Sequence, residues 1–512
     1  MSSVNRVIRN TLFLYGKMAI TLFISLYTTR LLLASLGITD YGIFNVVGGA
    51  ISMLGFLHAA MAGATQRFMS YAEGEGNSEK LKIIFNISVV LHFAIAIAVA
   101  LLLVVAGRFF FAGILNIPAD RIHSASLVYH FMVASTVATM MTVPYEAVLN
   151  AHENMLYFSV VGIAEALLKL GTAFLVMHTS DDKLVIYGGA MACISFLVML
   201  SMRIYTHAKY DECVFAPMCF WDKKLMKEMS NFAGWNLIGT ASGMISGYGS
   251  GIILNHFFGT VLNAANGITG QINGQMLALS NTMQRALAPM ITKDEGRGQR
   301  ESVIKSALTG SKLSFLMYVF FSIPLLIETP WILGKWLTTV PDWTVVFLRL
   351  SIFRVLIEQL TSSFGVAISA VGNIKGVNSY KSFVSIAELA LLGIIFSLGM
   401  PPFWFVVIGI VSAFVGCCIV LTQMIKCCGL ELNRFFKEMV MRLFAVCLGI
   451  FLIALIPHCL FPASYLRLGF TCLFSSAAYL VLVYSLALNM EEKNFAKGYA
   501  VSLYKKSCAV FG

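Results

Sequence analysis

Charged side chains inside apolar stretches are the residues of this sequence best suited to chemistry. Lys17 and Arg30 lie in the first apolar stretch, and Arg349 and Arg354 lie in the tenth. An ionised side chain within a bilayer is costly, so it usually has a function or a partner. Cations in such positions could contact an anionic group, such as a phosphate, on its way across a membrane.

Helical periodicity separates the two cations of the first stretch. At 100° per residue, Lys17 falls on one face with Thr21, Thr28 and Ser35, whereas Arg30 falls on roughly the opposite face. The pattern predicts a cationic helix that lines a cavity. The alternative is that both side chains snorkel towards the nearer membrane surfaces.

Some of the other charges can neutralise one another. Glu358 follows Arg354 by four residues, and Lys169 follows Glu165 by the same spacing, so each pair can meet on one helix face. We interpret these pairs mainly as structural neutralisation. Arg349 has no such partner nearby in the sequence and is the better candidate for contacting a substrate anion.

Amide side chains gather in the seventh and eighth stretches. The candidates for a substrate pathway are Asn236, Asn263, Asn266, Gln271 and Asn273. Asn263, Asn266 and Asn273 share one helical face. Such a face is expensive against lipid, so it lines water or another helix. It could hydrogen-bond sugar hydroxyls in a hydrated cavity, or it could pack helices together.

The elements that carry these residues are apolar stretches of roughly twenty residues, long enough to cross a bilayer about fourteen times. Hydrophobic residues make up 58% of the 512-residue chain and charged residues only 12%, against about a quarter in soluble domains. We predict an all-α integral membrane protein with about fourteen transmembrane helices. They start near Thr11, Tyr41, Ile83, Ser126, Met155, Leu184, Asn231, Val261, Ala307, Val345, Ser379, Pro401, Met439 and Ser464.

The excess of basic residues follows membrane topology. The chain has 36 Lys and Arg against 25 Asp and Glu, a net charge of +11. Most of the basic residues fall in alternate connections, which predicts that both termini are cytoplasmic. The first stretch is too long for a cleavable signal peptide. A multi-pass protein of the bacterial inner membrane is therefore expected, and nucleic acid is not an expected partner.

Two regions resemble each other and suggest an internal repeat. Gln66 and Arg67 precede an acidic, glycine-containing loop, and Gln284 and Arg285 precede another. The offset of six spans predicts a parallel repeat about the membrane normal. We predict a six-helix bundle over residues 1–210, a cytoplasmic connection over 211–230, a second six-helix bundle over 231–428, an extra helix pair over 429–490 and a cytoplasmic tail over 491–512.

Motifs of hydrolytic enzymes are missing from the sequence. There is no GxSxG, Walker A or HExxH motif, and the 11 cysteines show no zinc-site spacing. We therefore expect no catalytic residues, metal site or cofactor, apart from a coupling gradient of Na⁺ or H⁺. A membrane glycan ligase or polymerase is the enzymatic alternative, although such enzymes usually need a larger outer loop than this chain offers.

The segment over residues 27–49 resembles the start of polysaccharide transporters. Its most specific part contains Gly37, Asp40, Tyr41 and Gly42. These transporters belong to the multidrug/oligosaccharidyl-lipid/polysaccharide (MOP) exporter superfamily. The resemblance implies two six-helix bundles in a V, as in multidrug and toxic-compound extrusion (MATE) proteins, plus two extra helices. It also implies translocation of an undecaprenyl-pyrophosphate-linked oligosaccharide, with polysaccharide polymerase and chain-length proteins as possible partners.

Two other transport functions compete with this interpretation. A Na⁺- or H⁺-coupled multidrug exporter generally needs a buried carboxylate in the first or seventh span, and neither span has one here. Glu146, Glu165 and Glu388 keep that alternative open. A lipid II flippase is the third candidate.

Overall fold

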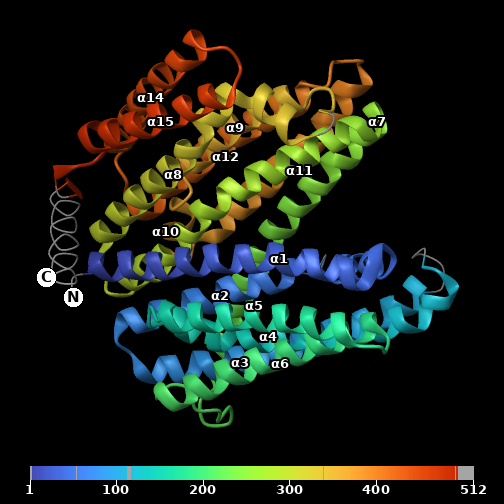
Figure 1. The fold of residues 1–512 in the computed structure, drawn as a ribbon. Helices are drawn as coiled ribbons and strands as arrows, with labels where there is room; N and C mark the ends of the chain where they lie inside the picture. The colour runs from blue at the N-terminus through green and yellow to red at the C-terminus, as the bar shows by residue number, and fades with distance from the viewer. Residues whose placement is uncertain (1–2, 53–54, 112–116, 338–339, 491, 494–512) are drawn as a thin grey trace, which may run out of the picture. The chain divides into compact units, whose positions relative to one another are not determined.

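The protein is almost entirely helical (Figure 1). The computed structural model describes residues 3–52, 55–111, 117–337, 340–490 and 492–493. Ten helices within these ranges are long and apolar enough to cross a membrane. The described residues contain no strand. The predicted fold class, an all-α membrane protein, is therefore confirmed.

Helices follow one another with short connections. In chain order the helices are α1 (Ser3–Ser52), α2 (Gly55–Glu75), α3 (Ser78–Phe109), η2 (Ala119–Arg121), α4 (Ile122–Ala151), α5 (Met155–His178), α6 (Lys183–Lys209), α7 (Lys223–Gly296), α8 (Arg300–Trp336), α9 (Thr344–Gln359), α10 (Phe364–Val371), α11 (Ile374–Ser397), α12 (Trp404–Cys428), α13 (Leu432–Phe435), η3 (Phe436–Val440), α14 (Met441–Leu460), α15 (Tyr465–Leu482) and η4 (Val483–Ala487).

Two helices are longer than the sequence predicts. α1 continues through the start near Tyr41, and α7 contains the starts near both Asn231 and Val261. The 50 residues of α1 would span about 75 Å if straight, more than twice the roughly 30 Å bilayer core. The expected boundary near Tyr41 is therefore wrong as a helix end. A glycine costs a helix only about 1 kcal/mol, so Gly37 and Gly42 need not terminate it.

Polar side chains set several helix starts. Asn77 accepts a hydrogen bond from the Lys80 N–H at 2.9 Å and begins α3. Asp182 and Asp222 cap α6 and α7 in the same way, and Ser464 caps α15. Each cap satisfies amide groups that the first helical turn leaves without a backbone acceptor. These residues therefore place the polar connections between the apolar segments.

The chain packs as two compact units. Unit 1 comprises Met1–Ile245, Arg285–Val303 and Val366–Ser382, and unit 2 comprises Ser246–Gln284, Ile304–Gly365 and Phe383–Gly512. The cores of unit 1 contain the fully buried Phe85 and Tyr129, and those of unit 2 contain Phe347 and Tyr318. The predicted division into six, six and two spans stays a prediction.

Within unit 2, a buried carboxylate joins the last two long helices to α8. Glu328 on α8 is fully buried, and its oxygens contact Arg467 at 2.6 Å and His458 at 3.0 Å. Thr471 donates a hydrogen bond to the same carboxylate at 3.4 Å. Because breaking a buried ion pair leaves an uncompensated charge, this contact holds α14 and α15 against α8.

Two glycines allow a close backbone crossing in unit 1. A Cβ atom at Gly74, near the end of α2, would overlap the carbonyl oxygen of Lys293. A Cβ atom at Gly296, the last residue of α7, would overlap the carbonyl oxygen of Tyr71. Small residues permit this approach of two helices. The crossing therefore joins the two acidic, glycine-containing segments that the sequence suggests are repeats.

We expect Gly74→Ala and Gly296→Ala to destabilise the purified protein. Each added methyl group meets backbone atoms that cannot move aside cheaply, and such overpacking costs about 1–3 kcal/mol. The apparent midpoint of thermal unfolding in detergent should fall for both variants. Gly234→Ala is the matched control, because a Cβ atom there meets open space. Equal midpoints for the two crossing variants and the control would contradict the crossing.

Candidate functional site

The side chain of Lys17 packs against α5 within unit 1. Its ammonium nitrogen is 3.9 Å from the centre of the Phe158 ring, a cation–π contact. A Cβ atom at Gly162 would overlap the Lys17 side chain, so α5 leaves room for this lysine. Thr21 and Thr28 donate hydrogen bonds to carbonyls of their own helix. The polar face predicted for α1 therefore has internal partners for these hydroxyls.

Charges from three further segments of unit 1 act on Lys17. They belong to Glu146 on α4, Glu165 on α5 and Arg285 on α7. Glu165 also binds Lys169 at 2.6 Å, which confirms the predicted pair. Glu146 is half-buried and Arg285 is exposed. We name Lys17, Glu146, Glu165 and Arg285 the central charged cluster.

The charges of the central charged cluster suit two kinds of ligand, an anion and a cation. Lys17 and Arg285 supply two cationic groups, and guanidinium is suited to binding phosphate oxygens. Glu146 supplies a carboxylate that could take a proton or a metal cation. The cluster therefore contains the predicted cation Lys17, the repeat-related Arg285 and Glu146, one of the carboxylates on which the exporter alternative depends.

Arg349 has a structural partner in unit 2. Its guanidinium donates hydrogen bonds to the carbonyl oxygens of Leu326 at 3.1 Å and Ile327 at 3.4 Å. Pro330 lies four residues after Leu326 in α8 and has no N–H to donate to that carbonyl. Arg349 therefore satisfies a carbonyl that the proline leaves unpaired. Its predicted contact with a substrate anion stays a prediction.

Arg354 forms the predicted pair with Glu358. Their side chains approach to 3.1 Å, and Arg354 also lies 3.7 Å from Glu388. A Cβ atom at Gly409 would crowd the guanidinium, which therefore packs closely against α12. The pair is confirmed, and Glu388 adds a second carboxylate that the sequence spacing could not reveal.

The described amide side chains belong to both units and have different environments. Asn273 is buried, donates to Ser351 at 2.8 Å and accepts from Tyr318 at 2.7 Å, so it joins α7 to α8 and α9. In unit 2, Asn266 is half-buried and Gln271 is exposed. Asn236 lies in unit 1, 3.5 Å from the Cβ position of Gly63.

Some predicted site residues cannot be placed. The side chains of Arg30, Gly37, Tyr41, Gly42 and Asn263 lie outside the described residues, although their backbones are helical. The cytoplasmic tail predicted over residues 491–512 lies outside them too, except for residues 492 and 493.

The repeat-related residues have different environments. Arg67 donates to the carbonyls of Ser369 at 3.0 Å and Ala370 at 3.1 Å, near the end of α10. Such a contact satisfies carbonyls that a helix end leaves unpaired. Gln66 is half-buried. In unit 2, Gln284 donates to hydroxyls at Ser314 and Ser362 and accepts from Ser363.

Asp40, from the family-like segment, belongs to an ion network. Arg121 approaches Asp40 at 2.6 Å and Asp182 at 3.0 Å. Burial alone would raise the pKa of Asp182, but hydrogen bonds from Ser124 and Arg121 outweigh it and hold that pKa below its usual value. Asp40 therefore links α1 to the starts of α4 and α6.

Unit 1 contains a second charged cluster, whose residues are not among the sites predicted from the sequence. His152 contacts Glu73 at 3.4 Å, forms a short hydrogen bond with Glu212 and stacks on Tyr210. Lys293 approaches Glu153 at 3.3 Å and Glu73 at 3.8 Å. Glu153 adopts a left-handed conformation with φ of 55°, which is uncommon for a residue with a side chain. We name these residues the His152 cluster: Glu73, His152, Glu153, Glu212 and Lys293.

Sequence spacing gave little sign of the His152 cluster. Its members come from α2, the turn before α5, the connection after α6 and the end of α7. The acidic residues near Gly74 predicted only a loop. The cluster lies beside the glycine crossing, so it supplies the charge contacts that accompany close packing of α2 and α7.

Comparison with known proteins identifies the fold. No family model and no curated relative matches the sequence. Solved structures of MATE transporters do match. One of them, a point mutant of a MATE protein, has a TM-score of 0.71 and 12% identity, covering 82% of this chain and 95% of that one.

Two further structures extend the comparison. An outward-facing multidrug resistance MATE family transporter of the MOP superfamily matches at a TM-score of 0.70 and 12% identity, covering 83% and 96% of the two chains. A MOP superfamily transporter from Pyrococcus furiosus, described as having a binding pocket of reversed polarity, matches at 0.68 and 12%, covering 84% and 96%. The chain therefore has the fold of MATE-type transporters.

The His152 cluster predicts a pH-dependent stability. Burial alone would lower the pKa of His152, but hydrogen bonds with Glu212 and Glu73 raise it to about 9. The unfolded value is about 6.5. The stabilisation from protonated His152 is therefore complete below about pH 6.5 and is lost as the pH rises through about 9.

We expect His152→Gln to flatten the pH dependence of thermal unfolding between about pH 6.5 and 9, the window set by the unfolded and folded pKa values. His178→Gln is the control, because His178 is exposed at the end of α5 and should leave the wild-type slope intact. The midpoint of thermal unfolding is measured for the three proteins at each pH. The same slope in His152→Gln and wild type would refute the charge assignment.

Proposed function

We propose that this protein translocates an undecaprenyl-pyrophosphate-linked oligosaccharide across the bacterial inner membrane by alternating access, with both termini cytoplasmic. The feature that supports this most is that two cationic side chains of unit 1, Lys17 and Arg285, lie close enough to act on each other electrostatically. A pyrophosphate carries negative charge that must cross a low-dielectric region, and paired cations compensate it there.

The fold supports a transport function of this kind. The similar solved structures are transporters of the MATE family and the MOP superfamily. The exposed Gln271 and half-buried Asn266 offer hydrogen bonds to sugar hydroxyls. Arg30 and Arg349 remain further candidates along the pathway, and a lipid II flippase would use the same anionic chemistry.

Glu146 favours a second candidate function. This carboxylate acts on Lys17 and Arg285 in the same cluster, and a protonatable carboxylate among cations is suited to coupling with Na⁺ or H⁺. The second candidate is therefore a cation-coupled multidrug exporter.

We expect the double variant Lys17→Gln/Arg285→Gln to lose most translocation of the glycan lipid. Charge-assisted hydrogen bonds are each worth about 1.5–3 kcal/mol, so losing one at each of the two positions should lower the initial rate roughly a hundredfold or more. Proteoliposomes loaded with a labelled undecaprenyl-pyrophosphate oligosaccharide measure this rate. Lys335→Gln, an exposed lysine at the end of α8, is the control for charge removal.

Glu146→Gln separates the two functions. If the protein is a cation-coupled exporter, this variant should abolish drug efflux driven by an ion gradient, and glycan-lipid transport should stay at background in every protein, wild type included. Wild-type rates of glycan translocation in Lys17→Gln/Arg285→Gln, at equal amounts of reconstituted protein, would overturn the proposal.

A further inference from the structure

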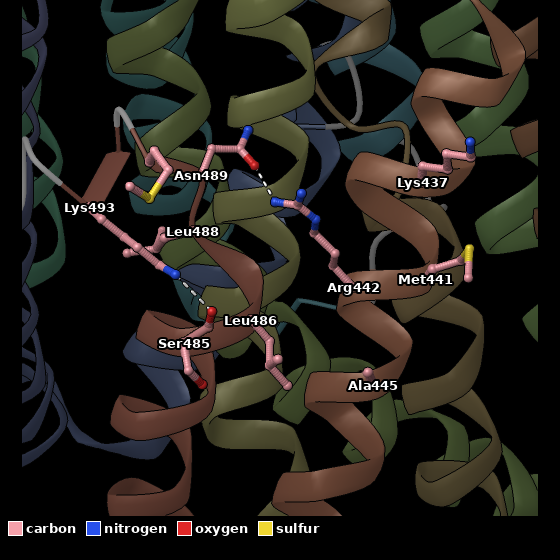
Figure 2. Close-up of a pocket in the computed structure, with 10 residues that line it drawn as sticks. Lys437, Met441, Arg442, Ala445, Ser485, Leu486, Leu488, Asn489 and Lys493 are labelled. Carbon is pink, nitrogen blue, oxygen red and sulfur yellow. Dashed lines mark hydrogen bonds between the residues drawn. The ribbon is translucent and has the colours of Figure 1, made fainter.

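A surface pocket lies at one end of the hairpin formed by α14 and α15. Its volume is about 660 Å³, and its walls come from η3 and the start of α14 and from η4 with the residues that follow it. The loop that joins the two helices is at residues 461–464, at the opposite end of the hairpin. The pocket therefore opens where two apolar, span-length helices reach their polar end (Figure 2).

Both sides of the hairpin change from α-helical to π-helical geometry at this pocket. The Met441 N–H donates to the Phe436 carbonyl, and the Leu488 N–H donates to the Val483 carbonyl at 3.1 Å. Each bond spans five residues. Single π turns inside helices occur frequently at functional sites, because they displace side chains from the regular helical positions. Here η3 lies between helical segments and η4 ends α15, so both walls of the pocket depart from regular α-helical geometry.

Three cations border the pocket, namely Lys437, Arg442 and Lys493. Figure 2 shows Arg442 directed towards Asn489 and Lys493 towards the carbonyl oxygen of Ser485. A guanidinium has five N–H donors and an ammonium has three. These contacts therefore leave donors available on both side chains for a bound anion, and Lys437 is exposed.

The nearby carboxylates are engaged by other cations. Glu438 lies 3.5 Å from Arg434, and Glu492 lies 2.6 Å from Lys312. Within the described part of the chain, no carboxylate lies within ion-pair distance of the three pocket cations. Among the described residues, the pocket therefore has an excess of positive charge at the edge of an apolar hairpin.

The remaining walls are mostly apolar. Met441 and Met490 are 64% and 74% exposed, and Leu486 and Leu488 lie beside them. A soluble anion would gain nothing from these side chains, whereas an acyl chain would cover them. The combination of cations and exposed apolar side chains matches a molecule with a charged head and a hydrocarbon tail.

We propose that this pocket binds an anionic phospholipid, with Lys437, Arg442 and Lys493 around its phosphate and the methionines and leucines against its acyl chains. Basic pockets between membrane helices recognise such headgroups. The bound lipid would bridge α14 and η4 and so stabilise the hairpin that Glu328 attaches to α8. This site shares no residue with the central charged cluster and does not depend on the identity of the transported cargo.

The test compares lipid binding by wild type and by the double variant Lys437→Gln/Lys493→Gln. Arg442 is kept, because its contact with Asn489 also joins the two sides of the hairpin. Native mass spectrometry measures the affinity for phosphatidylglycerol, and thermal unfolding shows that the variant is folded. Two cations each contribute about a factor of five at a membrane surface, so the affinity should fall roughly 25-fold.

The controls separate a built site from general surface charge. Lys227→Gln/Lys426→Gln removes two exposed lysines outside the pocket and should leave phosphatidylglycerol binding unchanged. Phosphatidylcholine should bind weakly, and inorganic phosphate should not stabilise the protein. Equal binding of phosphatidylglycerol by the pocket variant and wild type, an equal loss in the control variant, or equal stabilisation by phosphate alone would each overturn the proposal.

Discussion

The cost of leaving a polar group unsatisfied inside a bilayer is the constraint on which this structure depends. Pro330 removes a donor from α8, and Arg349 supplies one to the freed carbonyl of Leu326. Glu328 is fully buried, and Arg467 compensates its charge. In both cases a residue from another helix makes the contact, since Arg349 lies in α9 and Arg467 in α15. Polar side chains within apolar helices therefore hold neighbouring helices together here.

The same constraint distinguishes charges used for structure from charges available for transport. Arg354 is neutralised by Glu358 and Glu388, whereas Lys17 and Arg285 contribute two cations to one cluster. A transporter of an anionic cargo needs cations that its own carboxylates do not fully neutralise. The central charged cluster holds Lys17 and Arg285 together with Glu146 and Glu165, so one place in unit 1 carries the residues that separate the two candidate functions.

Close packing and charge act together where α2 and α7 end. Gly74 and Gly296 let the two backbones meet, and the Lys293 ammonium lies beside Glu73 and Glu153 in the same region. The acidic ends of α2 and α7 would repel each other without Lys293 and a protonated His152. At the other end of the chain, the pocket beside α14 has the opposite balance, with cations in excess. The anionic phospholipid that we propose there would supply the negative charge.

The sequence alone determined the fold class, because long apolar stretches with few charges can only be membrane helices. It also determined the pairs at a spacing of four, since Arg354 with Glu358 and Glu165 with Lys169 follow from helical geometry. Only the tertiary structure decided which distant charges meet. His152, Glu212 and Lys293 come from separate elements, and Arg349 found its partner in a carbonyl that no side-chain pattern reveals. Local periodicity specifies a helix face, but the neighbour of that face is decided by packing of the whole chain.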